Sequence, residues 1–136
     1  MQHIIIEPTY KSPRVILNPL KGEMSIEGKS ILVNVEEFYR PLLNWMDDFT
    51  KSIEVEEVEF SFDIEYFNLA STKRFMFFLI KLKDLEDKGV AVKVNWAYAS
   101  NDKNVLEMGE DLSKLLRLPF NFIAYEKAKE RLFTMN

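Results

Sequence analysis

The stretch between Lys51 and Lys73 holds the densest group of side chains that could do chemistry. It carries six acidic residues and no Lys or Arg. Carboxylates can bind a hard cation such as Mg²⁺, and paired carboxylates can exchange protons with a substrate. From Val58 to Tyr66 apolar residues alternate with polar ones, which predicts a strand with one apolar face and one acidic face. The residues expected to project from the acidic face are Glu57, Glu59, Asp63 and Glu65.

Three interpretations of this acidic face remain open at the level of sequence. Neighbours on one face of a strand are about 6.6–7 Å apart, which is too far for two of them to share one ion without further ligands. The face could simply be solvated and partly neutralised by Lys93 or Arg14. It could also be a docking surface for a basic partner, or a metal or catalytic site. We take it as the candidate partner-docking face.

A second candidate site lies where this strand meets the next helix. Asn68 is a good helix cap, and Ser71 and Thr72 follow in the first turn. The free N–H groups and the dipole at a helix N-terminus stabilise anions, so a phosphoryl group is physically plausible there. Ser71 and Thr72 are therefore the phosphorylation candidates. The alternative is that these residues only cap the helix.

The groups required for common catalytic mechanisms are missing. The only histidine is His3 near the terminus, no Gly-x-Ser-x-Gly elbow exists, and the chain has no cysteine. The four glycines are isolated, so neither a dinucleotide fingerprint nor a phosphate-binding loop can be written. We therefore predict a protein that is not an enzyme, with no cofactor and no metal.

Charge and hydropathy exclude two further classes of partner. The net charge is −4 and no basic face stands out, which argues against nucleic-acid binding. The longest apolar run, 75–80, is much shorter than the roughly 20 residues that a membrane span needs. No export signal is visible at the start, so we expect a cytoplasmic protein.

These residues must be positioned by a small α/β domain. Short strands are expected over 4–7, 14–18 and 24–27, with a hairpin turn at Lys21-Gly22. A helix capped by Asn34 should run to about 51, with a kink or restart at Pro41. Further strands are expected over 57–66, 90–98 and 120–124, and further helices over 72–88, 102–117 and 126–133.

The element order from residue 55 onward implies parallel strands joined by crossovers. Because those strands alternate rather than reading as continuous apolar runs, one sheet face should be open. We predict one domain over 1–136, a two-layer α/β fold with a mixed sheet of five or six strands and helices packed on one face. The expected core is Phe38, Leu42, Phe49, Phe60, Phe62, Ile64, Phe75, Leu79, Leu82, Val92, Val94, Leu112 and Leu115.

Taken in order, several short pieces make the sequence resemble the SiaC family of bacterial regulatory phosphoproteins, whose fold is similar to the STAS domains of anti-sigma-factor antagonists. The resemblance covers all but the final dozen residues. The pieces that carry it are Thr9-Tyr10-Lys11-Ser12-Pro13, Gly22-Glu23-Met24-Ser25-Ile26-Glu27-Gly28, Phe38-Tyr39-Arg40-Pro41 with Trp45, Tyr66-Phe67-Asn68 with Ser71-Thr72-Lys73, and Val94-Asn95-Trp96-Ala97-Tyr98.

The resemblance implies a partner switch in cyclic di-GMP signalling. Family members look like targets of a serine/threonine kinase and a PP2C-type phosphatase, and their unphosphorylated form binds and activates a diguanylate cyclase. The family's phosphoacceptor directly follows the strand-end Asn, and here that position is Leu69, which cannot accept phosphate. Three interpretations follow: Ser71 or Thr72 took over the role, phosphorylation was lost, or the match is shifted by two or three residues. The alternatives to this function are a small metal-dependent enzyme that uses the acidic face, or a scaffold domain that is not phosphorylated.

Overall fold

In the computed structural model, which describes residues 1–127, a six-stranded sheet is backed by three helices. The expected helix over 126–133 lies almost entirely outside these residues. The chain runs β1 (Ile4–Ile6), β2 (Arg14–Asn18), β3 (Glu23–Ser30), α1 (Val35–Lys51), β4 (Glu57–Phe67), α2 (Leu69–Asp87), β5 (Ala91–Ala99), α3 (Lys103–Leu116) and β6 (Phe120–Tyr125).

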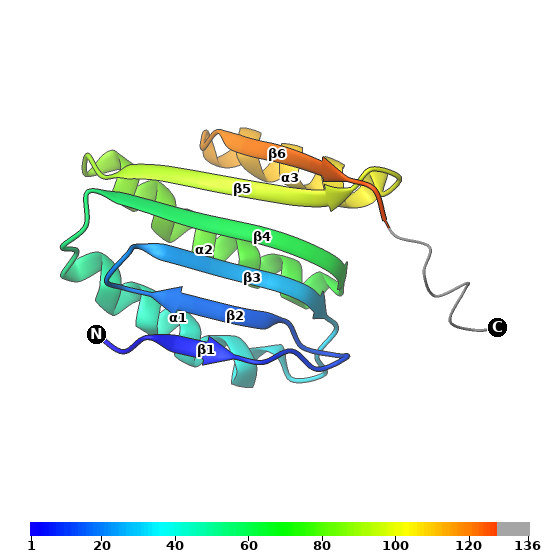
Figure 1. The fold of residues 1–136 in the computed structure, drawn as a ribbon, viewed down its shortest axis with the longest axis horizontal. Helices are drawn as coiled ribbons and strands as arrows, with labels where there is room; N and C mark the ends of the chain where they lie inside the picture. Colours follow the sequence, from blue (N-terminus) through cyan, green and yellow to red (C-terminus); the bar gives the residue numbers. More distant parts are fainter. Residues whose placement is uncertain (128–136) are drawn as a thin grey trace.

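The strands lie in the sheet in sequence order. β1, β2 and β3 pair antiparallel, whereas β3 to β6 pair parallel through the three helical crossovers. The three helices of residues 1–127 all lie behind the sheet in Figure 1, so none of them covers its other face. This confirms the predicted mixed α/β fold with helices on one face. No helix within residues 1–127 is both long and apolar enough to cross a bilayer.

Local signals place the first elements as predicted. The tight turn before β3 contains Gly22 at φ +67°, a left-handed conformation that favours glycine. The side-chain oxygen of Asn34 accepts from the backbone N–H of Glu37 at 3.1 Å and so caps α1. Pro41 lies inside α1, which continues through it as one element, so the helix does not restart there. Two boundaries differ from expectation by three residues, since β3 extends to Ser30 and α2 begins at Leu69.

A bulge in β4 overturns one predicted orientation. Gly28 pairs with Ile64, but the next residue, Lys29, pairs with Tyr66, so Glu65 is an extra residue in β4. A bulge of this kind reverses the alternation beyond it. Tyr66, expected on the apolar face with Ile64, is instead 48% exposed on the open face.

Most of the expected core residues are buried, with three exceptions. Leu115 is 69% exposed, while Phe38 and Val92 are only partly buried. Leu115 projects from α3 beside the face that packs, because the buried positions of that helix are Val105, Gly109 and Leu112. Large residues that the prediction omitted fill the core instead: Tyr39, Trp45, Met46, Phe78, Leu85, Trp96 and Leu118.

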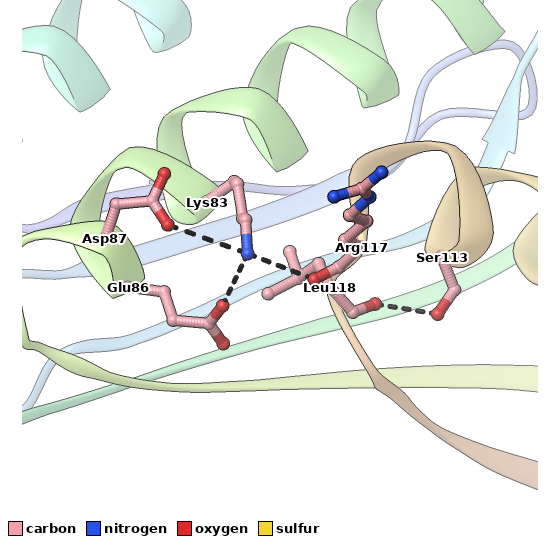
Figure 2. A network of polar contacts seen from close by, with 6 residues as sticks. All are labelled: Lys83, Glu86, Asp87, Ser113, Arg117 and Leu118. Carbon is pink, nitrogen blue, oxygen red and sulfur yellow. Dashed lines mark hydrogen bonds and ion pairs between the residues drawn. The ribbon is translucent and has the colours of Figure 1, made fainter.

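A small network of hydrogen bonds and ion pairs connects the end of α3 to α2. Arg117 adopts a left-handed conformation at φ 53° and ends the helix, and the Ser113 hydroxyl donates to the Leu118 carbonyl at 2.7 Å. Lys83 of α2 donates to the Arg117 carbonyl at 3.1 Å (Figure 2). Because Lys83 also pairs with Glu86 and Asp87 at 2.9 and 3.6 Å, its ammonium group is held in place against the α3 terminus.

Candidate functional site

The open sheet face carries acidic residues opposite one another on two neighbouring strands. In the parallel pairing of β3 with β4, Glu23 lies opposite Glu59 and Glu27 lies opposite Asp63. Like charges in such positions destabilise a sheet. The strand alternation places all four predicted docking residues on this face, with Val58, Phe60, Phe62 and Ile64 buried beneath it. We call this set the acidic face: Glu23, Glu27, Glu57, Glu59, Asp63 and Glu65.

Neighbouring side chains offset part of this negative charge. Lys93 lies 3.8 Å from the Glu59 carboxylate and Arg14 lies 3.5 Å from Glu27. These are the two neutralising neighbours expected from the sequence. Asn95 donates to Glu59 at 2.6 Å, which orients that carboxylate. Lys127 lies 3.9 Å from Glu65, so three of the six carboxylates have a basic neighbour and acidic residues remain in excess on this face.

Asp63 is a partly buried member of the acidic face whose carboxyl has a raised pKa. Burial raises the pKa of its carboxyl above the usual range, and the charges of Glu27 and Glu65 raise it further. The Tyr125 hydroxyl donates to Asp63 at 2.9 Å, which acts in the opposite direction by stabilising the carboxylate. Placing a positive charge beside this group should therefore be favourable.

The acidic face does not assemble a metal site. Across residues 1–127 no three His, Cys, Asp or Glu side chains come together in a way that could hold a metal ion. The side chains of β4 are spread along the strand, so they present charge to a surface rather than converging on one point. This arrangement fits recognition of a basic surface better than catalysis.

At the strand–helix junction, Asn68 acts as the N-cap of α2. Its side-chain oxygen accepts from the backbone N–H of Ser71 at 3.0 Å, and its amide donates to the Leu32 carbonyl at 2.9 Å. One side chain thus fixes the start of α2 and the loop that follows β3.

Ser71 proves to be a buried structural residue. It is 0% exposed, and its hydroxyl accepts from the Ser30 hydroxyl at 2.7 Å. The Ser30 hydroxyl has one hydrogen, which it donates to Ser71. The Tyr39 hydroxyl oxygen lies 2.6 Å from that of Ser30 and must therefore be the donor to it. The Ser71 hydroxyl in turn can donate to the Asn68 side chain at 2.7 Å. A kinase cannot reach this hydroxyl in the folded chain, which makes Ser71 an unsuitable phosphate acceptor.

The other two positions at this junction are more accessible. Thr72 is partly buried, and its hydroxyl makes only long contacts, 3.4 Å to the Asn68 carbonyl and 3.7 Å to the sulfur of Met108. Leu69, at the first position of α2, is 87% exposed. One highly exposed position of the junction therefore holds a large apolar residue.

Sequence reasoning missed three participants. Glu23 and Glu27 extend the acidic face onto β3, and their alternation with Met24 and Ile26 could have revealed them. Tyr39 was omitted because its hydroxyl partner Ser30 lies in another element, which no local pattern indicates.

Comparison with known proteins places the chain among bacterial regulators. A family model described as "SiaC family regulatory phosphoprotein" matches residues 6–125. A curated but uncharacterised protein of Pseudomonas aeruginosa strain UCBPP-PA14 is 24% identical over 93% of this chain and 100% of its own length.

Two solved structures show the same fold. Apo-SiaC from Pseudomonas aeruginosa has a TM-score of 0.80 and 23% identity, over 91% of this chain and all of that one. SiaC bound to the diguanylate cyclase SiaD, described there as its activator, has a TM-score of 0.82 and 24% identity, over 90% of this chain and 99% of that one.

Proposed function

The chain belongs to the SiaC family of regulatory phosphoproteins, and from that premise we propose that it is a non-catalytic module that binds a diguanylate cyclase and regulates it. The SiaC of Pseudomonas aeruginosa, which shares its fold, forms such a complex as an activator. Only the general part of that role is assigned to this chain: it binds a cyclase and changes its activity.

The observation that carries the proposal is the uncovered acidic face. No helix of residues 1–127 covers this sheet face, and Glu23 opposite Glu59 and Glu27 opposite Asp63 keep like charges side by side. A basic partner surface would relieve that repulsion on binding. Complementary charge also speeds association and discriminates against wrong partners.

We further propose control by a serine/threonine kinase and a PP2C-type phosphatase, with Thr72 as the acceptor. Its hydroxyl lies in the first turn of α2, where the helix dipole tolerates a phosphoryl group of about −1.5 to −2 charges. Partner binding would then weaken where apolar or acidic side chains of the partner contact the start of α2, because the phosphoryl group is hydrated and negative. Leu69, at the family's acceptor position, cannot take this role.

Two measurements test this proposal. Intact-mass analysis of the protein purified from its own cells should show a fraction heavier by one phosphoryl group, and peptide mapping should place that group on Thr72. Thr72→Asp should weaken binding to the cyclase. Thr72→Val, which keeps the shape of the threonine side chain and adds no charge, should leave binding unchanged. If no phosphate is found on residues 68–73 and both variants bind the cyclase equally well, control by phosphorylation at this junction is contradicted.

The rival function, a metal-dependent enzyme using the acidic face, is tested by calorimetry with Mg²⁺, Mn²⁺ and Ca²⁺. Our proposal predicts only weak, nonspecific heats. Tight binding of one ion that Asp63→Asn abolishes would favour the rival.

A further inference from the structure

Large apolar side chains gather on the surface at one end of the sheet. Twelve large hydrophobic residues are exposed within residues 1–127, and five of them belong to segments that meet at this end. Val33 is 96% exposed and Leu69 is 87% exposed, values that leave these side chains almost wholly in water. We call this set the apical patch: Tyr10, Ile31, Val33, Tyr66 and Leu69.

Hydrogen bonds bring the segments of the apical patch together. The backbone N–H of Ile31 donates to the Lys11 carbonyl at 2.9 Å, which joins the loop after β1 to the end of β3. The Asn68 side chain donates to the Leu32 carbonyl at 2.9 Å, which joins the loop after β3 to the start of α2. In Figure 1 the β1–β2 loop and the ends of β3 and β4 all lie at the right-hand end of the sheet.

Buried hydrogen bonds connect the segments beneath the patch. The buried hydroxyl chain from Tyr39 through Ser30 to Ser71 lies directly under the loop and the helix start that carry Val33 and Leu69. A surface that is already ordered loses little conformational entropy when a partner binds. Exposed apolar side chains on a rigid support are typical of a binding surface.

Lysines rim the apical patch. The Lys11 ammonium lies 5.7 Å from the Tyr10 ring centroid, and the Lys29 ammonium lies 5.5 Å from that of Tyr66. Lys73 follows Leu69 by four residues and therefore lies on the same side of α2. None of these three lysines belongs to an ion pair within the part of the chain that the structure describes.

Charge is thus divided between two neighbouring surfaces. The carboxylates of Glu36 and Glu65, which border the patch in sequence, are already paired with Arg40 and Lys127. The apical patch is apolar and basic, whereas the acidic face beside it is polar and negative. Tyr66, on the open face at the end of β4, connects them.

We propose that the apical patch is a second docking surface, which takes a protein segment that presents large apolar side chains beside carboxylates. The inference rests on the proposed function only in assuming that the partner is a protein. Acidic side chains of the partner would contact the apical patch, and its basic side chains would contact the acidic face. An anionic membrane is the less favoured occupant, because three lysines fall short of the 4–8 basic residues typical of lipid-binding clusters.

Site-specific photo-crosslinking in the native cells tests this assignment. p-Benzoylphenylalanine would replace Val33 or Leu69, and Leu20 would serve as the control position. Leu20 is also 87% exposed, but it lies in the β2–β3 turn at the opposite end of the sheet. We expect crosslinks from positions 33 and 69 at least tenfold above those from position 20, and a crosslinked peptide rich in apolar residues and net negative.

The identity of the crosslinked peptide separates the two proposals. A cyclase peptide of this composition would support both, and an apolar, acidic peptide from another protein would support the apical patch alone, leaving cyclase binding to be decided at the acidic face. A lipid adduct, a basic peptide, or no excess over position 20 would overturn the apical patch. In a binding assay with the captured partner, Leu69→Asp should lower affinity at least tenfold and Leu20→Asp should leave it unchanged; equal affinities would also overturn it.

Discussion

The hydroxyl of Ser30 donates to that of Ser71 at 2.7 Å, which ties the end of β3 to the start of α2 across 41 positions in sequence. Both residues are fully buried, and within residues 1–127 no buried side-chain polar atom lacks a partner. Because Tyr39 must donate into this chain of hydroxyls, each member depends on the next. The chain supports the surface from which Val33 and Leu69 project.

Removal of the Ser71 hydroxyl should therefore destabilise the fold. Ser71→Ala leaves the Ser30 hydroxyl without its acceptor and should lower the free energy of unfolding by about 1–3 kcal/mol. Ser71→Asp buries an uncompensated charge and should cost about 3–5 kcal/mol. Urea unfolding followed by circular dichroism measures both. Thr72→Asp is the matched control, and equal stability of the two Asp variants would show that Ser71 is not buried.

Gly109 should tolerate no side chain. A Cβ atom added there would lie 2.5 Å from Nε1 of Trp96, whose indole also donates to the Val105 carbonyl at 2.9 Å. Gly109→Ala should therefore force the indole or α3 to shift, at a cost of about 1–3 kcal/mol in unfolding free energy. Glu110→Ala, at the exposed neighbouring position, should change stability by less than about 0.5 kcal/mol. Unfolding monitored by tryptophan fluorescence compares the two, and a neutral Gly109→Ala variant would contradict the observed packing.

The raised pKa of Asp63 predicts a pH-dependent effect on stability. Between the pKa of this carboxyl in the unfolded chain and its higher pKa in the folded chain, the folded state binds more protons. Its contribution to stability therefore falls as pH rises through that window, and the penalty is full above the folded pKa. Asp63→Asn can still accept from Tyr125 and should raise the unfolding free energy at pH 7, with the gain fading toward pH 3.

Unfolding curves collected from pH 3 to pH 8 measure this difference. Glu57→Gln removes one charge from an exposed position of the same face and serves as the control. A gain for Asp63→Asn that stays constant across this range would show that the carboxyl is not destabilised by its surroundings.

Local chemistry predicted the elements of this fold well. Asn34 and Asn68 were recognised as helix caps from residue type and position, and each accepts the expected backbone N–H. The alternation in β4 predicted an open sheet face because it depends only on the two-residue period of a strand. The family resemblance, carried by short ordered pieces, agreed with the match over residues 6–125.

Relationships between distant segments could not be predicted in the same way. The bulge at Glu65 depends on the register with β3 and moves Tyr66 to the open face. Leu115 satisfies a helical spacing, yet the orientation of α3 leaves it 69% exposed. Ser71 looked like a surface hydroxyl because its partners Ser30 and Tyr39 lie far away in the chain.

Reconstitution with a diguanylate cyclase from the same cells tests the central claim most directly. Cyclic di-GMP formation would be followed with the cyclase alone, with the chain added, and with a variant in which Glu59 and Asp63 are replaced by Lys. The account predicts that the chain changes the cyclase rate at least several-fold at saturation and that the charge-reversed variant, although folded, requires a much higher concentration. Rates that are identical with and without the chain, for every cyclase of those cells, would contradict it.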